Sequence, residues 1–329
     1  MKKSSGKVVI TGAAGLVGQN LIPRLMAKGF QEIVAIDKHA TNVKILEKYY
    51  PGIRVLHRNL AEDQNWKDEF SGCDALVIAH AQIGGINPEE FIRNNVVATE
   101  RVLEAAIGSR VPYIVNISSS VVNSMAIDNY TETKKTQEAL ISSSAIPQVV
   151  LRPTLMFGWF DRKHVGWLAR FMQRVPVFPI PGSGRFLRQP LYAADFCEII
   201  VSSILSGITG AYNITGQERI DYIDLMRAVK KATGAKVHIQ RIPYGVFLAL
   251  LKVNARFDRN PAFTVGQLKA LVTPDVFEVI DWPRILMSAP LLCRRPWPRP
   301  FGTLCTLMWC WISSLRISLS YCLGEVFYR

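Results

Sequence analysis

The feature that most restricts the fold of this chain is a regular alternation of short apolar runs and helical stretches. The runs are rich in valine and isoleucine and recur at intervals of roughly 20 to 40 residues between Lys7 and about Ala211. They read KVVITG, EIVAID, IRVLHRN, ALVIAH, YIVNISS and QVVLRPT, with helical patterns such as QNLIPRLMAKG and FIRNNVVATERVLEAA between them. Because buried apolar strands that alternate with helices indicate a parallel sheet covered on both faces, we expect an α/β fold with a doubly wound sheet.

Beyond this alternation we expect a smaller lobe and an atypical end. We assign residues 1–175 to the first domain, with strands that return near 190–215, and residues 176–286 to a substrate-binding lobe. Residues 287–329 contain no lysine, aspartate, asparagine, glutamine or histidine, yet hold four of the six cysteines. This composition predicts an out-of-frame product or a weakly membrane-like tail, whose uncharged stretch 301–315 is shorter than the ~20 residues that span a bilayer.

Composition excludes several classes of protein. The 329 residues are 49% hydrophobic and 20% charged, which is typical of a globular chain. The net charge of +13 is spread from Lys2 to Arg329 without a basic run or zinc-finger spacing, so we expect anionic small molecules as ligands and no nucleic-acid partner. Only Cys73 and Cys197 precede residue 287, and no metal-ligand spacing occurs, so we expect a reduced, cytoplasmic protein without a metal or a membrane span.

A glycine-rich turn follows the first apolar run. Gly12, Gly15 and Gly18 stand between the run and the helix after it. A tight turn needs positions without a β-carbon, and the amino terminus of the helix then offers free N–H groups and partial positive charge to a diphosphate. Asp37 ends the second run, where a carboxylate accepts hydrogen bonds from both ribose hydroxyls of an adenosine and repels a 2′-phosphate. The pattern predicts a Rossmann-type domain that binds NAD rather than NADP, with the adjacent Lys38 softening that preference.

A serine run and a tyrosine–lysine pair follow the fifth apolar run. Ser119 and Ser120 stand at the carboxyl end of a predicted strand, where doubly wound sheets place their ligands. Tyr130 and Lys134 are one helical turn apart, so their side chains share one face of a helix. An ammonium about 4 Å away stabilises a phenolate by up to ~4 kcal/mol at an effective dielectric constant near 20. We therefore expect Lys134 to lower the pKa of Tyr130 towards neutrality, so that the phenol exchanges a proton with a substrate hydroxyl while a hydride passes to or from NAD.

With these motifs in this order, the chain resembles the extended short-chain dehydrogenase/reductases, and within them the NAD-dependent nucleotide-sugar epimerase/dehydratase family. The resemblance covers roughly residues 7–285 and extends to the stretches NLAED, VIAHAQ, NNVVATERVLEAA, LRPTLMFG and RQPLYAADF. It implies NAD as the cofactor, a UDP- or GDP-sugar as the substrate, epimerisation or keto reduction at C4 as the reaction, and a homodimer.

The resemblance also implies roles for four residues near the cofactor. Asn59 and Leu60 would border the adenine, and Ala81 would lie near the ribose and diphosphate. Asn95 would support the active site. For residues of these types, packing or the capping of a helix is the alternative explanation.

Further positions bear on the substrate. By the resemblance, Ser120 orients the substrate beside Ser119, Lys134 holds the nicotinamide ribose and Arg188 grips the nucleotide diphosphate. Two valines stand where the family's 4,6-dehydratases carry Asp-Glu, so dehydration is not expected. Leu155 stands where sugar-nucleotide relatives often have asparagine, which keeps open a dehydrogenase for a hydroxysteroid-like alcohol. A cofactor-binding subunit without catalysis is the third interpretation.

Overall fold

The computed structural model describes residues 6–124, 128–257, 265–272, 278 and 280–286, which form two compact units. The first unit comprises the chain up to Thr154, the segment Ala193–Thr215 and a short return near the end of the described residues. The second unit comprises Leu155–Tyr192 and the chain from Gly216 onwards. The predicted tail at 287–329 lies outside the described residues.

The first unit is built on a seven-stranded sheet in which all neighbouring strands are parallel. Its order is β3-β2-β1-β4-β5-β6-β11, so the direction of winding reverses between β1 and β4. The strands are β1 Lys7–Thr11, β2 Glu32–Asp37, β3 Arg54–His57, β4 Ala75–Ile78, β5 Ile114–Ile117, β6 Gln148–Pro153 and β11 Gly210–Ile214. Each predicted apolar run contains one of these strands, so the expected doubly wound α/β fold is confirmed.

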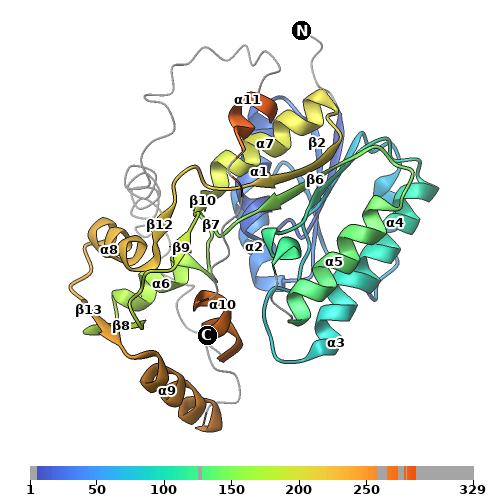
Figure 1. Cartoon of the computed structure of the whole chain (residues 1–329). Helices are drawn as coiled ribbons and strands as arrows, with labels where there is room; N and C mark the ends of the chain where they lie inside the picture. The colour runs from blue at the N-terminus through green and yellow to red at the C-terminus, as the bar shows by residue number, and fades with distance from the viewer. Residues whose placement is uncertain (1–5, 125–127, 258–264, 273–277, 279, 287–329) are drawn as a thin grey trace. The chain divides into compact units, whose positions relative to one another are not determined.

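Helices cover both faces of this sheet, as Figure 1 shows. Helices α4 and α5 pack on one face, over a buried cluster that includes Trp66 and Phe70, and α1 packs with α7 on the other face. The helices of this unit are α1 Leu16–Ala27, α2 Ala40–Tyr49, α3 Pro88–Phe91, α4 Ala98–Gly108, α5 Asn129–Ser142, α7 Ala193–Ser206 and α11 Trp282–Leu286, with 3₁₀ turns η1 Lys67–Phe70 and η3 Ser120–Asn123 and the π-helix η2 Ile92–Val97. The central strands β1, β4 and β5 are buried on both sides, which is why the sequence shows continuous apolar runs there rather than alternation.

The second unit is smaller and combines short two-stranded sheets with helices. Its elements are β7 Met156–Phe157, α6 Val165–Met172, β8 Val177–Pro181, β9 Leu187–Arg188, β10 Leu191–Tyr192, β12 Ile220–Asp221, α8 Tyr222–Thr233, β13 His238–Ile242, α9 Tyr244–Phe257 and α10 Val265–Val272. A core cluster that includes Phe157, Phe178 and Met226 packs α6 against α8.

The chain passes from the first unit to the second at residue 155. The chain leaves the central sheet after β6, because β7 pairs with β10 and not with a strand of that sheet. Helix α6 then contributes Val165 and Met172 to the core cluster of the second unit. Residues 155–175 therefore belong to the second unit, while α7 and β11 return to the first.

Candidate active site

The glycine turn is packed too closely to accept side chains. Gly12 has φ +68°, and a β-carbon there would lie 2.6 Å from the backbone nitrogen of His80. A β-carbon on Gly18 would lie 2.0 Å from the carbonyl oxygen of Ala13, whereas Gly15 has more room. Within the described residues no side chain caps the amino terminus of α1, and its first turn carries no acidic residue. This bare helix end beside a glycine cradle fits the diphosphate of a dinucleotide.

Asp37 joins the end of β2 to this turn. One carboxylate oxygen accepts a hydrogen bond from the backbone N–H of Ala14 at 2.9 Å, and the other accepts from the N–H of His39 at 2.8 Å. Burial raises the pKa of Asp37, and these two hydrogen bonds oppose that effect. The neighbouring Lys38 donates to the side chain of Asn94 at 2.8 Å. Asp37 is thus held rigidly at the edge of the turn, which fits the ribose of NAD.

Asn59 and Leu60 shape the loop after β3. The side-chain oxygen of Asn59 accepts a hydrogen bond from the backbone N–H of Ala61 at 3.1 Å. The backbone N–H of Asn59 donates to the Asp63 carboxylate at 2.7 Å. Leu60 is buried in the core cluster of the first unit. Ala81, just after β4, is exposed. Contact of these residues with the cofactor stays a prediction.

Asn95 lies at the point where the helical path before α4 widens into the π-helix η2, a distortion that is frequent at functional sites. Its buried side chain donates to the carbonyl of Gln82 at 3.1 Å and to the hydroxyl of Thr133 at 2.9 Å, and accepts from the N–H of Gln82 at 2.6 Å. Asn95 therefore ties the loop after β4 to α5, one residue before Lys134.

Ser119 and Tyr130 lie near each other at the carboxyl end of β5. Helix α5 begins after Asp128, whose side chain accepts from the N–H of Thr131 at 2.7 Å and so caps the helix that carries Tyr130. The Ser119 side chain lies near the Tyr130 phenol and lowers its pKa. Ser120 is buried next to them at the start of η3.

The predicted lowering of the Tyr130 pKa is wrong for the protein alone. Burial raises the pKa of the phenol, the nearby Ser119 side chain lowers it only in part, and the Asp128 carboxylate raises it further. The Lys134 ammonium instead donates to the carbonyl oxygen of Ile117 at 2.9 Å and to the side-chain oxygen of Gln137. Burial also lowers the pKa of Lys134 to about 7, which weakens its charge near neutral pH.

Gln137 connects Lys134 to a network of buried polar side chains. Gln137 donates to the hydroxyl of Thr99 at 2.8 Å, and the two ring nitrogens of His80 lie 3.0 Å from Thr99 and 2.8 Å from the hydroxyl of Thr11. Burial lowers the pKa of His80 to about 3, so its ring is neutral. Sequence reasoning missed this network. The only signals were a histidine in VIAHAQ and a glutamine three residues after Lys134.

A second set of contacts fixes α5 against the sheet. Glu138 accepts a hydrogen bond from the Ser118 hydroxyl at 2.5 Å and pairs with the Arg152 guanidinium of β6. These contacts lower the pKa of Glu138 against the opposing effect of burial. The helix face that carries Tyr130 and Lys134 is therefore anchored to both β5 and β6.

Arg188 lies on β9 in the second unit. Its guanidinium donates to the carbonyl oxygen of Leu187 at 2.7 Å and to that of Leu271. It also lowers the pKa of Tyr222 against the larger, opposite effect of burial. The contacts are those of a residue that stabilises its own unit, and the grip on a diphosphate stays a prediction.

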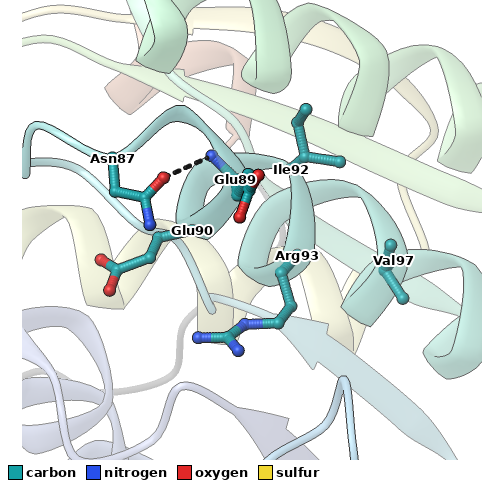
Figure 2. A pocket seen from close by; sticks show the side chains of 6 residues that line it. All are labelled: Asn87, Glu89, Glu90, Ile92, Arg93 and Val97. Atoms are coloured by element: carbon teal, nitrogen blue, oxygen red, sulfur yellow. Dashed lines mark hydrogen bonds between the residues drawn. The ribbon is translucent and has the colours of Figure 1, made fainter.

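A cavity of about 260 Å³ lies on α3 and η2, beside the segment that carries Asn95, and Figure 2 shows the side chains around it. Asn87 accepts from the N–H of Glu89 at 3.0 Å at the edge of this cavity. Its lining residues are Asn87, Glu89, Glu90, Ile92, Arg93 and Val97. It contains none of the predicted site residues.

The described residues contain no group of three or more histidine, cysteine, aspartate or glutamate side chains that could hold a metal ion. Of the helices in this part of the chain, none has the length and apolarity that crossing a bilayer requires.

Comparison with known proteins gives a family and several relatives. The model of the NAD dependent epimerase/dehydratase family matches residues 8–215. A 4-hydroxy-2-methyl-3-oxo-4-farnesyl-3,4-dihydroquinoline-1-oxide ketoreductase of Stigmatella aurantiaca is 26% identical over 261 residues, which cover 72% of this chain and 76% of that one. Ceramide reductase of Caulobacter vibrioides is 22% identical, over 82% of this chain and 85% of its own. The structure of a UDP-glucuronic acid 4-epimerase from Bacillus cereus in complex with NAD has a TM-score of 0.64 at 21% identity, over 72% of this chain and 87% of that one.

Proposed function

Because the chain belongs to the NAD-dependent epimerase/dehydratase family, we propose that it exchanges a hydride between NAD and a secondary alcohol or ketone of a nucleotide-activated sugar, at C4. The observation that carries the proposal is the grouping of Tyr130, Ser119 and Lys134 at the carboxyl edge of the sheet. The glycine turn at the end of β1 opens on the same edge, two strands away.

The glycine turn, Asp37 and Lys134 would hold the cofactor. Gly12 and Gly18 leave room for the diphosphate at the amino terminus of α1, and Asp37 would accept hydrogen bonds from the adenosine ribose. Lys134 would hold the nicotinamide ribose. When bound, NAD accepts a hydride from the substrate carbon or returns one to it.

Tyr130 would move the proton that accompanies the hydride. Its raised pKa makes the neutral phenol the resting form, which suits donation of the proton to the oxygen of a ketone. In the opposite direction the phenolate takes the proton of the substrate hydroxyl, helped by Ser119. Ser120, buried beside Ser119, would orient the reacting oxygen.

A second candidate is reduction of a ketone on a lipophilic substrate. Two observations favour it: Leu155 brings an apolar side chain where a polar sugar contact was expected, and two relatives are named as reductases of a farnesyl-quinoline oxide and of a ceramide. The same residues would perform the chemistry, so only the substrate separates this candidate from the first.

The test is hydride transfer with a divided panel of substrates. The purified protein is mixed with NAD or NADH and with UDP- or GDP-sugars in one arm, and with sterols and long-chain ketones in the other. Formation or loss of reduced nicotinamide, or inversion at C4 of the sugar without net change of the cofactor, with the sugars alone supports the first candidate. Turnover of the lipophilic set alone supports the second. Cofactor binding with neither reduction, oxidation nor inversion in either arm would contradict both and indicate a non-catalytic subunit.

A further inference from the structure

Helix α9 in the second unit combines an apolar sequence with an exposed position. Its sequence is YGVFLALLKVNARF, in which more than half of the residues are large and apolar, and none of them is buried. Such a helix is normally covered on at least one side, because large contiguous apolar patches on a free surface are rare.

The apolar residues of α9 divide between two sides. Phe247, Leu248 and Leu251 are half-buried, on a helix that contacts α10. The outer stripe consists of side chains that recur at helical spacing and are 51%, 57%, 57% and 83% exposed: Val246, Leu250, Val253 and Phe257. In Figure 1, α9 lies at an end of the second unit, after β13.

The chain that leads into α9 is rich in basic residues. Between Leu225 and Phe257 it has no acidic residue and seven basic ones, namely Arg227, Lys230, Lys231, Lys236, Arg241, Lys252 and Arg256. Asp224, directly before this stretch, pairs with Arg227 at 2.8 Å. Lys252 and Arg256 are exposed on α9 itself. Three more of the seven, Arg227, Lys230 and Lys231, line a cavity of about 450 Å³ at the end of α8 and the start of β13.

We propose that the second unit docks through α9 on the surface of a bilayer that contains anionic phospholipids. The outer stripe would lie at the level of the headgroups and upper acyl chains, and Lys252 and Arg256 would lie close to the lipid phosphates. A helix of 14 residues whose exposed apolar side chains lie in one stripe suits binding in the plane of the membrane surface.

The positive charge of this region favours an anionic bilayer over a second copy of the chain or residues 287–329 as the partner of α9. A second copy would bring an equally basic segment against the first. Residues 287–329 of the same chain carry five arginines and one glutamate, so they do not offer complementary charge either. Anionic lipid supplies both the apolar interior and the negative surface. The inference does not depend on which substrate the active site uses.

Flotation of the full chain with lipid vesicles tests the proposal. One set of vesicles is phosphatidylcholine alone, and the other contains about one quarter phosphatidylglycerol. We expect binding to the anionic vesicles, weaker binding to the neutral ones, and loss of binding as salt is raised.

Two pairs of matched variants locate the surface. Leu250→Ser removes an exposed apolar side chain from α9 and is expected to weaken vesicle binding about tenfold, whereas Ile107→Ser, on α4 in the first unit and 59% exposed, leaves it unchanged. Lys252→Glu is expected to weaken binding to anionic vesicles about tenfold, and Lys48→Glu, on exposed α2 surface, is its control. Circular dichroism and thermal melting check that all four variants stay folded.

Several results would overturn the proposal. They are the absence of vesicle binding at either composition, binding that survives Leu250→Ser and Lys252→Glu, and equal losses in the control variants. A smaller assembly of Leu250→Ser in solution, with vesicle binding intact, would assign the stripe to a contact between copies instead.

Discussion

Replacing Gln137 by methionine is expected to lower the pKa of Lys134 further. In the structure Lys134 is 1% exposed, and its ammonium donates hydrogen bonds to the carbonyl oxygen of Ile117 and to the side-chain oxygen of Gln137. Burial already brings its pKa to about 7. Methionine has a similar length but no oxygen, so the variant keeps the packing and removes one acceptor from the charged form.

The size of the effect follows from that lost acceptor. A hydrogen bond to a charged group contributes about 1.5 to 3 kcal/mol, and 1.36 kcal/mol corresponds to one pH unit. The pKa of Lys134 in Gln137→Met is therefore expected to fall by about one to two pH units. At neutral pH most molecules of the variant would then carry a neutral amine at this position.

Nuclear magnetic resonance of protein labelled with ¹³C at the lysine ε-carbon measures this directly. The Lys134 signal is identified by its absence from Lys134→Met, and Lys135, exposed on the same helix, is the internal reference. Gln173→Met, at an exposed position of the second unit, is the control variant. A Lys134 midpoint near the ordinary lysine value in the parent, or the same midpoint in Gln137→Met, would refute the reasoning.

Stability should follow the same titration. Since the pKa of Lys134 is lower in the folded protein than in the unfolded chain, the unfolded chain binds more protons between the two values. The free energy of unfolding therefore rises as the pH increases from about 7 to 10.5. Urea unfolding across that range measures the slope, and Lys134→Met is expected to remove this contribution.

Three other changes test the surroundings of the site. Gly18→Ala is expected to cost roughly 1 to 3 kcal/mol of stability and to abolish NAD binding, because the added β-carbon meets the Ala13 carbonyl. The control Gly52→Ala places its β-carbon in open space and is expected to be tolerated. Equal thermal melts and equal NAD affinity of the two variants would contradict this. Burial lowers the pKa of His80 to about 3, so on acidification this histidine is protonated in the unfolded chain before it is protonated in the folded protein. The free energy of unfolding is therefore expected to fall by roughly 3 kcal/mol from pH 7 to pH 4 through this residue. In denaturant melts, His80→Gln should not show this decrease. Asp37→Asn removes the charge that repels a 2′-phosphate and should raise the affinity for NADP relative to NAD about tenfold. Calorimetric titrations in which the ratio of the two affinities is unchanged would contradict the role of Asp37.

Features that depend on local sequence were predictable. The strands follow from continuous apolar runs, and the turn follows from glycines whose close contacts exclude a β-carbon. Tyr130 and Lys134 share a helix face because of their spacing alone. The family match over residues 8–215 confirms the resemblance that these motifs indicated.

Features that depend on contacts between distant segments were not predictable. The Coulomb estimate for Tyr130 assumed a nearby, fully charged lysine, but burial acts on both groups, and Gln137 is one of the groups that hold the ammonium. The network through His80 and Thr99 joins three separate elements, and no local pattern marks it. The path of the chain after β6 likewise follows from the pairing of β7 with β10, two short strands with little sequence signal.

The central claim is that the Tyr130 phenol transfers the proton that accompanies hydride transfer. The measurement is the single-turnover rate of appearance or loss of reduced nicotinamide, for the parent and Tyr130→Phe, with whichever substrate the panel identifies. The account predicts that Tyr130→Phe binds NAD as tightly as the parent and loses at least about a hundredfold in this rate. Equal rates in the two proteins would contradict it.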